Sequence, residues 1–337
     1  MGLQKYLYVL TSSLSDTYYE QFLLSLVSLR MYNPHNEVVV LTDTKTKESL
    51  TGKRGKYEKF VSDIRLIEPP EKLGQKELSR WIKTSVRRFV SGDFLFIDCD
   101  TVIAGPFDFL PLQNITLGSV LDTHVLLSEH HHRKEFSKRN DILDFAANDN
   151  TLYFNSGIIF CRDTHETHAF FDKWHDLWVE GNKRGISADQ PSFNQANYEL
   201  SNIITELPGE WNCQISHNGL PYLCNAKIIH YYATSLVSFV PAYRLASPEI
   251  LASIKMTGDI PKEAMKMLEN PKTAFESQTR IIADPAVIGA FDGSLFSKLI
   301  WLNKRHPNFF KKCDNFMSCL TKIIKRLLGK NNVRSSN

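Results

Sequence analysis

The chain lacks a long apolar run. No stretch of its 337 residues approaches the roughly 20 apolar residues that a membrane-spanning helix needs. Its N-terminus, MGLQKYLYVLTSS, has one lysine before a short strand-like segment and no signal-peptide core. We therefore expect a protein that stays in the cytosol. Internal repeats and low-complexity segments are also absent.

Cysteine is sparse and scattered. The six cysteines form no Cys-x-x-Cys pair, so the sequence indicates neither a disulfide framework nor a structural zinc site. The first predicted strand is followed by LTSSLSD, which has no glycine-rich phosphate loop. That absence argues against a sugar-nucleotide pyrophosphorylase.

The charge is uneven along the chain. Hydrophobic residues make up 42% and charged residues 23%, as in ordinary globular proteins. Residues 294–337 hold ten Lys and Arg against one acid, a net charge of +9, which leaves −6 for residues 1–293 from the chain's total of +3. The acidic body and the absence of a nucleic-acid-binding motif argue against a nucleic-acid partner.

Strand-like and helix-like segments alternate through the first hundred residues. Short apolar runs at 5–11, 38–42, 64–67 and 94–97 predict strands, and helical periodicity predicts helices over 19–32 and 76–90. This order predicts an α/β fold in which ligands bind at the carboxyl ends of parallel strands. Further strands are expected at 117–121 and 152–161, separated by a polar insertion that is either mobile or substrate-facing. A helix follows with core-facing aromatic residues.

The strongest chemical signal is FLFIDCDT, in which an apolar strand delivers Asp98 and Asp100 two residues apart. Two carboxylates so placed suit Mg²⁺ or Mn²⁺, which are commonly shared between protein oxygens and a substrate diphosphate. Two acids that cap a turn at the end of a strand would give the same short pattern.

Several motifs in a fixed order resemble one known family. They are LTSS followed by Tyr19, SRWIKT, FLFIDCDTVIAGPFDFL, LYFNSGIIF, ADQPSFNQ and AKIIHYY. This order resembles the nucleotide-sugar glycosyltransferases of the GT-A fold, most of all glycosyltransferase family 8, which includes glycogenin and bacterial lipopolysaccharide galactosyl- and glucosyltransferases. The resemblance spans about residues 5–232. It implies a Rossmann-like, mixed but mainly parallel sheet flanked by helices in a catalytic domain of residues 1–240.

The resemblance assigns a metal site. Asp98 and Asp100 match the family's Asp-x-Asp, and His230 matches a histidine that supplies a third ligand. An imidazole beside two carboxylates favours Mn²⁺ over Mg²⁺. Taken alone, His230 would more simply be a hydrogen-bonded histidine at a strand end.

Other matches concern the nucleoside. Thr11 and Ser12 resemble positions that contact it, and Tyr19 resembles a tyrosine that stacks on uracil. Tyr19 also lies on the apolar face of its helix, which predicts a core residue. Asp43 follows the second strand, where it either bonds a ribose hydroxyl or opens a turn.

A cation before the metal motif is expected to contact the donor diphosphate and sugar. Arg80 and Lys83 stand at i, i+3 on one helix face, and the alignment does not choose between them. The alternative is a solvated helix face that also carries Arg87 and Arg88.

Further matches concern the sugar. Asn155 meets the sugar in the family, Gly157 permits close backbone approach, and Asp122 resembles another acid of the sugar pocket. Asp189 and Gln190 match a pair near the anomeric carbon. Ser187-x-x-Gln190 also reads as a helix capping box, an alternative structural role for this segment.

The chain departs from the family after His230. Family 8 members usually continue with Gly-x-x-Lys-Pro-Trp, whereas this chain reads YYATSLVSFVPAY with no lysine. The family retains anomeric configuration, and no carboxylate here is an obvious nucleophile, so we expect front-face attack. Asp98-Cys-Asp100-Thr101 also resembles the motif of haloacid-dehalogenase-type phosphatases, but several predicted elements precede it and no Gly-Thr follows.

The basic end of the chain predicts a membrane contact. Residues 241–293 are expected to be a helical extension or linker, and 294–337 a basic amphipathic tail. Its apolar stripe is Phe316, Leu320, Ile323, Ile324 and Leu327, flanked by Lys322, Lys325, Arg326 and Lys330. This pattern is typical of an interfacial helix on anionic lipid, or of a helix packed on the domain. We therefore expect a metal-dependent enzyme of cell-surface polysaccharide synthesis on the cytoplasmic face of a membrane. An inactive membrane-bound binding protein is the alternative.

Overall fold

The computed structural model describes residues 5–70, 73–130, 132–148, 150–232, 243–275 and 294–331. The chain divides into two compact units, Met1–Thr279 and Arg280–Asn337. Each unit is described separately below.

A seven-stranded sheet forms the centre of the first unit, in the order β3-β2-β1-β4-β7-β6-β8. The strands are β1 (Lys5–Leu10), β2 (Glu37–Thr42), β3 (Asp63–Leu66), β4 (Phe94–Ile97), β6 (Leu117–Ser119), β7 (Ile158–Cys161) and β8 (Ile204–Glu206). Strand β7 pairs antiparallel with β4 and β6, while the other pairs are parallel. The prediction of a mixed, mainly parallel sheet is confirmed.

Strand β1 is buried on both faces. Tyr6, Tyr8 and Leu10 enter one hydrophobic core, and Leu7 and Val9 enter the other. Successive side chains of a strand point to opposite faces, which explains this division. A strand covered on both sides reads as a continuous apolar run, as the sequence does here.

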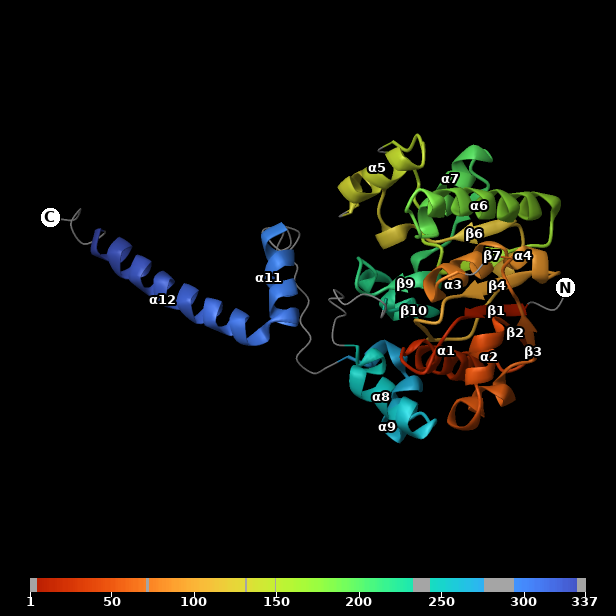
Figure 1. The fold of residues 1–337 in the computed structure, drawn as a ribbon, viewed down its shortest axis with the longest axis horizontal. Coiled ribbons are helices and arrows are strands. Elements are labelled where there is room, and N and C mark those ends of the chain that lie inside the picture. Colours follow the sequence, from red (N-terminus) through yellow and green to blue (C-terminus); the bar gives the residue numbers. More distant parts are fainter. Residues whose placement is uncertain are drawn as a thin grey trace. The chain divides into compact units, whose positions relative to one another are not determined.

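Helices cover both faces of the sheet (Figure 1). One face carries α3 (Gln75–Thr84), α4 (Val86–Phe89), α6 (His165–Lys183) and α7 (Gln190–Glu199). The other carries α1 (Tyr18–Tyr32), α8 (Pro248–Thr257) and α9 (Lys262–Leu268). The remaining helices of this unit with α labels are α2 (Thr44–Ser49) and α5 (Arg133–Ile142).

The helix expected over 76–90 is broken at Ser85. Its φ of −104° and ψ of 9° separate α3 from α4. The Ser85 hydroxyl donates to the carbonyl of Trp81 at 2.7 Å. A serine that bonds back onto its own helix commonly bends it.

A second, three-stranded sheet places the expected histidine. Its order is β5 (Thr101–Ile103), β10 (Ile228–His230) and β9 (Cys213–Gln214). Strands β10 and β5 are antiparallel, with His230 opposite Thr101. This register brings His230 next to Asp100 from 130 residues away in the sequence.

Helices α8 and α9 belong to the first unit and pack on α1 and its core. Ile250, Ile254 and Leu268 join the same core as α1. The hydroxyl of Tyr32 donates to the carbonyl of Leu268 at 3.1 Å. The part of 241–293 that the structure describes is therefore helical and shares this core.

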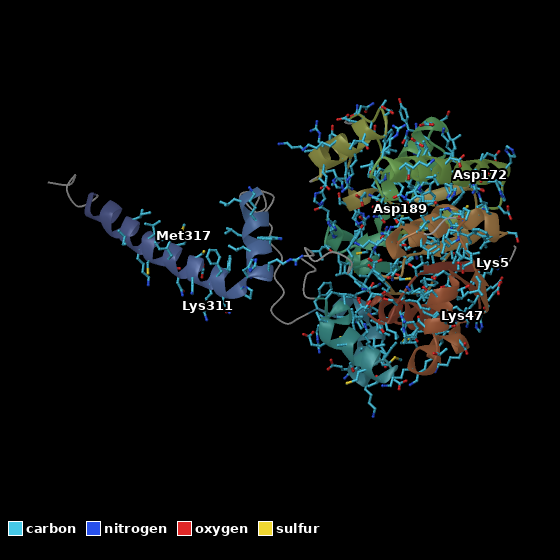
Figure 2. All side chains as sticks on the ribbon, in the orientation of Figure 1. Lys5, Lys47, Asp172, Asp189, Lys311 and Met317 are labelled. Atoms are coloured by element: carbon cyan, nitrogen blue, oxygen red, sulfur yellow. The ribbon has the colours of Figure 1, made fainter. Side chains whose placement is uncertain are left out.

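The second unit contains α11 (Ser294–Arg305) and α12 (Pro307–Asn331). Figure 2 shows the side chains that project from α12, with Lys311 and Met317 labelled. Phe309, Phe316 and Ile323 are 57%, 67% and 53% exposed. The side chains of Lys325, Arg326, Leu327 and Lys330, and residues 332–337, lie outside the described part. Among the described helices, none is both long and apolar enough to cross a bilayer.

Candidate active site

A cavity of about 200 Å³ opens at the carboxyl ends of β1 and β4. Chain connections leave these two neighbouring strands in opposite directions across the sheet, so their ends diverge and form a crevice. Ten of the predicted site residues line this cavity. They are Thr11, Arg80, Lys83, Asp98, Asp100, Asn155, Gly157, Asp189, Gln190 and His230.

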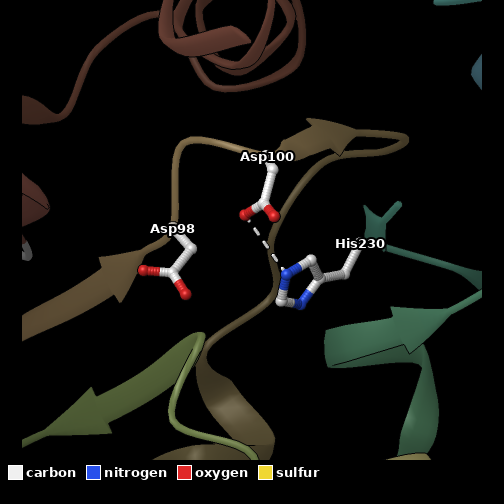
Figure 3. A group of neighbouring side chains, drawn as sticks. All are labelled: Asp98, Asp100 and His230. Carbon is white, nitrogen blue, oxygen red and sulfur yellow. Dashed lines mark ion pairs between the residues drawn. The ribbon is translucent and has the colours of Figure 1, made fainter. Parts of the chain in front are cut away.

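Three candidate metal ligands converge at this cavity (Figure 3). One ligand atom each from Asp98, Asp100 and His230 lies within 4.8 Å of the others. Nε2 of His230 is 3.3 Å from Oδ1 of Asp100. Two carboxylate oxygens and one imidazole nitrogen at this spacing suit a hard or borderline divalent cation. The described residues therefore fit a divalent metal ion.

Gly157 closes the wall beside these ligands. A Cβ atom at this position would lie 2.6 Å from Cε1 of His230 and 3.0 Å from Oδ2 of Asp98. Its carbonyl also accepts a hydrogen bond from the amide of Asp98 at 2.9 Å. Only glycine lets the backbone approach His230 and Asp98 this closely.

Lys83 joins two acids, the buried Asp189 and the half-buried Asp98. Its Nζ is 3.2 Å from both carboxylate oxygens of Asp98 and 3.1 Å from Oδ2 of Asp189. Burial alone would lower the pKa of Lys83, but the two carboxylates outweigh it and raise the pKa. Lys83 therefore carries a positive charge within the cavity wall.

Asp189 is held in its ionised form. Ser156 donates to Oδ2 at 2.9 Å, and Nε of Arg80 lies 3.5 Å from Oδ1. Burial would raise the pKa of Asp189, but Lys83 and Arg80 outweigh it and lower that pKa to about 2. Arg80 and Lys83 thus both face the site. The sequence offered either of them as the cation that contacts the donor, and the structure allows both to do so.

The helix capping box predicted as an alternative for Ser187-x-x-Gln190 is not formed. Helix α7 has Asp189 at its N-cap, and that side chain makes no capping hydrogen bond. The side chain of Gln190 turns to the cavity, where Oε1 accepts a hydrogen bond from Asn155 at 3.2 Å. Both side chains are therefore directed to the site.

Ser12, Tyr19 and Asp43 do not line the cavity. Tyr19 is 1% exposed, packs in the core and lies under the guanidinium of Arg54 at 4.5 Å. Asp43 caps α2 by accepting from the amide of Thr46 at 3.2 Å. Stacking of Tyr19 on a base does not fit this burial, and Asp43 opens helix α2.

Asp122 lies behind the cavity. Its Oδ1 accepts from Asn155 at 2.9 Å, and its Oδ2 is 3.0 Å from Nε2 of His130. Burial would raise the pKa of Asp122, but the bond to His130 outweighs it, so the pKa is lowered. Asp122 therefore positions Asn155 in this structure.

Sequence reasoning missed several lining residues. They are Tyr18, Gln21, Gln75, Lys76, Ser79, Ser156 and Tyr232. One helix face of α3 carries Lys76, Ser79, Arg80 and Lys83, at positions i, i+3, i+4 and i+7. This spacing is the sequence pattern from which Lys76 and Ser79 could have been predicted to line the site. Tyr18 directly precedes Tyr19, the tyrosine that was predicted to stack on the base.

Comparison with known proteins places the chain among glycosyltransferases. The model of glycosyl transferase family 8 matches residues 9–235. No curated protein sequence matches the chain.

Solved structures resemble the fold. The galactosyltransferase LgtC in complex with donor and acceptor sugar analogues is 14% identical with a TM-score of 0.50, covering 78% of this chain and 99% of that chain. GlyE of Streptococcus pneumoniae TIGR4 is 15% identical with a TM-score of 0.48, covering 83% of this chain and 66% of that chain. Mouse xyloside xylosyltransferase 1 is 12% identical with a TM-score of 0.46, and the match covers 70% of this chain and 99% of that chain. The likeness to LgtC identifies the GT-A fold.

Proposed function

This chain is a member of glycosyl transferase family 8, and on that premise we propose that it moves a hexose from a nucleoside-diphosphate sugar, UDP-glucose or UDP-galactose, to a hydroxyl group of a saccharide or lipid-linked acceptor. The observation that carries the proposal is the convergence of Asp98, Asp100 and His230 at the strand ends that line the cavity. Membership of this family also argues against a haloacid-dehalogenase-type phosphatase, the other enzyme class that the Asp98-Cys-Asp100-Thr101 motif resembles.

The three ligands would hold Mn²⁺ or Mg²⁺ together with the donor diphosphate. A bound divalent metal supplies a Lewis acid that stabilises the charge of the departing diphosphate. The imidazole of His230 favours Mn²⁺. Gly157 keeps the backbone close without blocking the ligands.

Helix α3 would supply the cations that contact the diphosphate. Lys83 is already engaged by Asp98 and Asp189. Arg80 is 38% exposed at its side chain, and Lys76 is exposed without an ion pair in the described part of the chain. These two cations line the cavity and can compensate for the lysine missing after His230. The segment that replaces the family loop, residues 233–242, lies outside the described residues.

The site chemistry supports retention of configuration. An inverting enzyme needs a general base whose pKa lies near the working pH. Asp189 accepts from Ser156 and pairs with Lys83 and Arg80, which lower its pKa. Asp122 bonds Asn155 and is not among the residues that line the cavity. Neither acid is placed as such a base, so the proposed reaction is front-face attack with Asp189 and Gln190 shaping the sugar pocket. NMR of the product decides the point, because an inverted anomer would overturn it.

The donor proposal is tested by titration calorimetry with Mn²⁺ and a set of nucleoside diphosphates and nucleotide sugars. The paired variant Lys76→Gln/Arg80→Gln should weaken UDP binding and leave uridine binding unchanged. Equal loss for UDP and uridine would contradict a diphosphate role for these cations. No binding of any donor would favour the inactive binding protein.

The tail supports a location on the cytoplasmic face of a membrane. Helix α12 presents exposed Phe316, Met317 and Ile323 together with exposed Lys311 and Lys322. Apolar burial in the lipid interface and attraction to anionic headgroups act together in such helices. The proposed enzyme would then draw a soluble donor from the cytosol and meet a membrane-bound acceptor.

A further inference from the structure

A chain of hydrogen bonds runs from the backbone of Gly157, just before β7, to the candidate metal ligand His230. It begins at the amide of Gly157, which donates to Oδ1 of Asn155 at 2.9 Å. A backbone N–H can only donate, so this atom of Asn155 must be its oxygen. The opposite atom, Nδ2, donates to the carboxylate of Asp122 at 2.9 Å, which can only accept when ionised. The amide orientation of Asn155 is thus fixed from both sides.

The second link is Asn212, which is fully buried at 0% exposure. Its Nδ2 donates to Oδ1 of Asn155 at 2.9 Å. Because that acceptor is an oxygen, the contacting atom of Asn212 must be its NH₂ group. The amide oxygen of Asn212 therefore faces the other way, toward His230.

The last link reaches the imidazole. Oδ1 of Asn212 lies 3.1 Å from Nδ1 of His230. An amide oxygen only accepts, so Nδ1 must carry a hydrogen atom. The nitrogen that can offer a lone pair is then Nε2, which points to Asp100 at 3.3 Å. The tautomer follows from the donor and acceptor sequence of the whole chain of bonds.

We propose that Asn212 is a positioning residue that fixes His230 in the tautomer with hydrogen on Nδ1, so that Nε2 is presented to a divalent cation beside Asp98 and Asp100. Asn212 is not among the residues that line the cavity and acts through His230. The inference rests on the proposed metal site. Hydrogen-bond partners of this kind orient metal-bound histidines, and their loss costs roughly 10- to 100-fold in metal affinity.

The direct test is the tautomer in the metal-free protein. Two-bond ¹H–¹⁵N correlation spectra of the full chain with ¹⁵N-histidine, recorded at about pH 8, identify which ring nitrogen of His230 carries hydrogen. The wild-type protein should show hydrogen on Nδ1. Hydrogen on Nε2 with none on Nδ1 would overturn the inference, and this measurement needs no variant to fold.

The second test compares two variants by electron paramagnetic resonance titration with Mn²⁺. Asn212→Leu removes the acceptor and should weaken Mn²⁺ binding roughly 10- to 100-fold. Asn212→Asp keeps an acceptor for Nδ1–H and should remain closer to the wild-type affinity. Asn197→Leu is the matched control, because Asn197 is also buried and bonds the backbone of Ile204 at 2.9 Å, away from the cavity. It should leave Mn²⁺ affinity unchanged.

The outcomes separate this inference from the proposed function. Unchanged Mn²⁺ affinity and an unchanged tautomer in Asn212→Leu would overturn the role of Asn212 while leaving the metal site intact. Equal weakening by Asn212→Leu and Asn197→Leu would assign the effect to general destabilisation and also overturn it. Failure of the wild-type protein to bind Mn²⁺ would overturn the metal site itself.

Discussion

The backbone at Gly157 and the imidazole of His230 lie so close that a methyl group at position 157 would come within 2.6 Å of Cε1 of His230. The same methyl group would lie 2.9 Å from Oδ1 of Asn155. A single glycine therefore touches both the candidate metal ligand His230 and Asn155, which accepts from the Asn212 amide that contacts His230.

Gly157→Ala should weaken Mn²⁺ binding roughly 10- to 100-fold, because His230 and Asp98 must move away from the new methyl group. Titration of Mn²⁺ by electron paramagnetic resonance measures the change. Gly55→Ala is the matched control, since the nearest atom to its added Cβ is the carbonyl oxygen of Leu50 at 3.8 Å. Wild-type affinity in Gly157→Ala would show that the ligands are not packed as described.

Lys83→Met should lower the free energy of unfolding by about 3 to 5 kcal/mol, because Asp98 and Asp189 lose a buried counter-ion. Urea unfolding of the metal-free protein measures it. Lys173→Met is the control, since its pair with Glu199 lies near the surface, with side chains 39% and 34% exposed. That change should cost under about 1 kcal/mol. Equal costs for the two variants would mean that Lys83 is not a buried counter-ion.

His175 should make stability depend on pH. Its Nδ1 is 2.8 Å from the hydroxyl of Thr84, and burial, assisted by Arg88, lowers the pKa of His175 from 6.5 to about 4. Between these values the unfolded chain binds a proton that the folded protein does not, so stability falls as the pH falls. The loss is complete only below about pH 4.

The measurement is urea unfolding at several pH values. Relative to His175→Gln, the wild-type protein should lose on the order of 2 to 3 kcal/mol between pH 6.5 and pH 4. His124 and His217 also have a pKa lowered to about 4, and they remain in both proteins. The difference therefore isolates His175, and parallel pH curves would contradict its burial as a neutral group.

The tail should bind anionic vesicles in preference to zwitterionic ones. Each basic residue near the surface contributes about 1 kcal/mol, so Lys311→Gln/Lys312→Gln should weaken vesicle binding by the full chain by about an order of magnitude or more. Asp314→Asn, which removes the tail's one acid, should strengthen it. Flotation with vesicles of each type measures both changes. Equal binding to both vesicle types would contradict an electrostatic contact.

The order of motifs in the sequence predicted the family and half of the residues that line the cavity. Asp98 and Asp100 follow an apolar strand, and a strand end fixes the position of the next residues almost without help from the rest of the chain. His230 was predicted because AKIIHYY matches a motif of the family in the right order. Local pattern was sufficient for the two acids, and the resemblance supplied the histidine.

Local pattern failed where tertiary packing decides. Adjacent residues Tyr18 and Tyr19 both lie in the first turn of α1, and only the packing of Arg54 and Tyr57 against Tyr19 determines which ring is buried. Asn212 acquires its role from partners at 155 and 230. Nothing adjacent in the sequence marks such a residue.

The strand expected over 152–161 begins later, at Ile158. Phe154 forms only an isolated bridge with Leu121. Asn155, Ser156 and Gly157 line the cavity instead of extending the sheet. Apolar periodicity does not reveal where a strand gives way to a binding loop.

We propose that this protein transfers a sugar with a metal held by Asp98, Asp100 and His230. The most direct measurement follows free nucleoside diphosphate released from a panel of nucleotide sugars in the presence of Mn²⁺ and candidate acceptors. Asp98→Ala/Asp100→Ala is compared with Asp172→Ala/Asp176→Ala, a matched pair of surface acids beside Arg88. We expect metal-dependent turnover of one donor. Asp98→Ala/Asp100→Ala should lose this turnover, and Asp172→Ala/Asp176→Ala should keep it. Full turnover in Asp98→Ala/Asp100→Ala, or turnover indifferent to removal of the metal, would contradict this proposal.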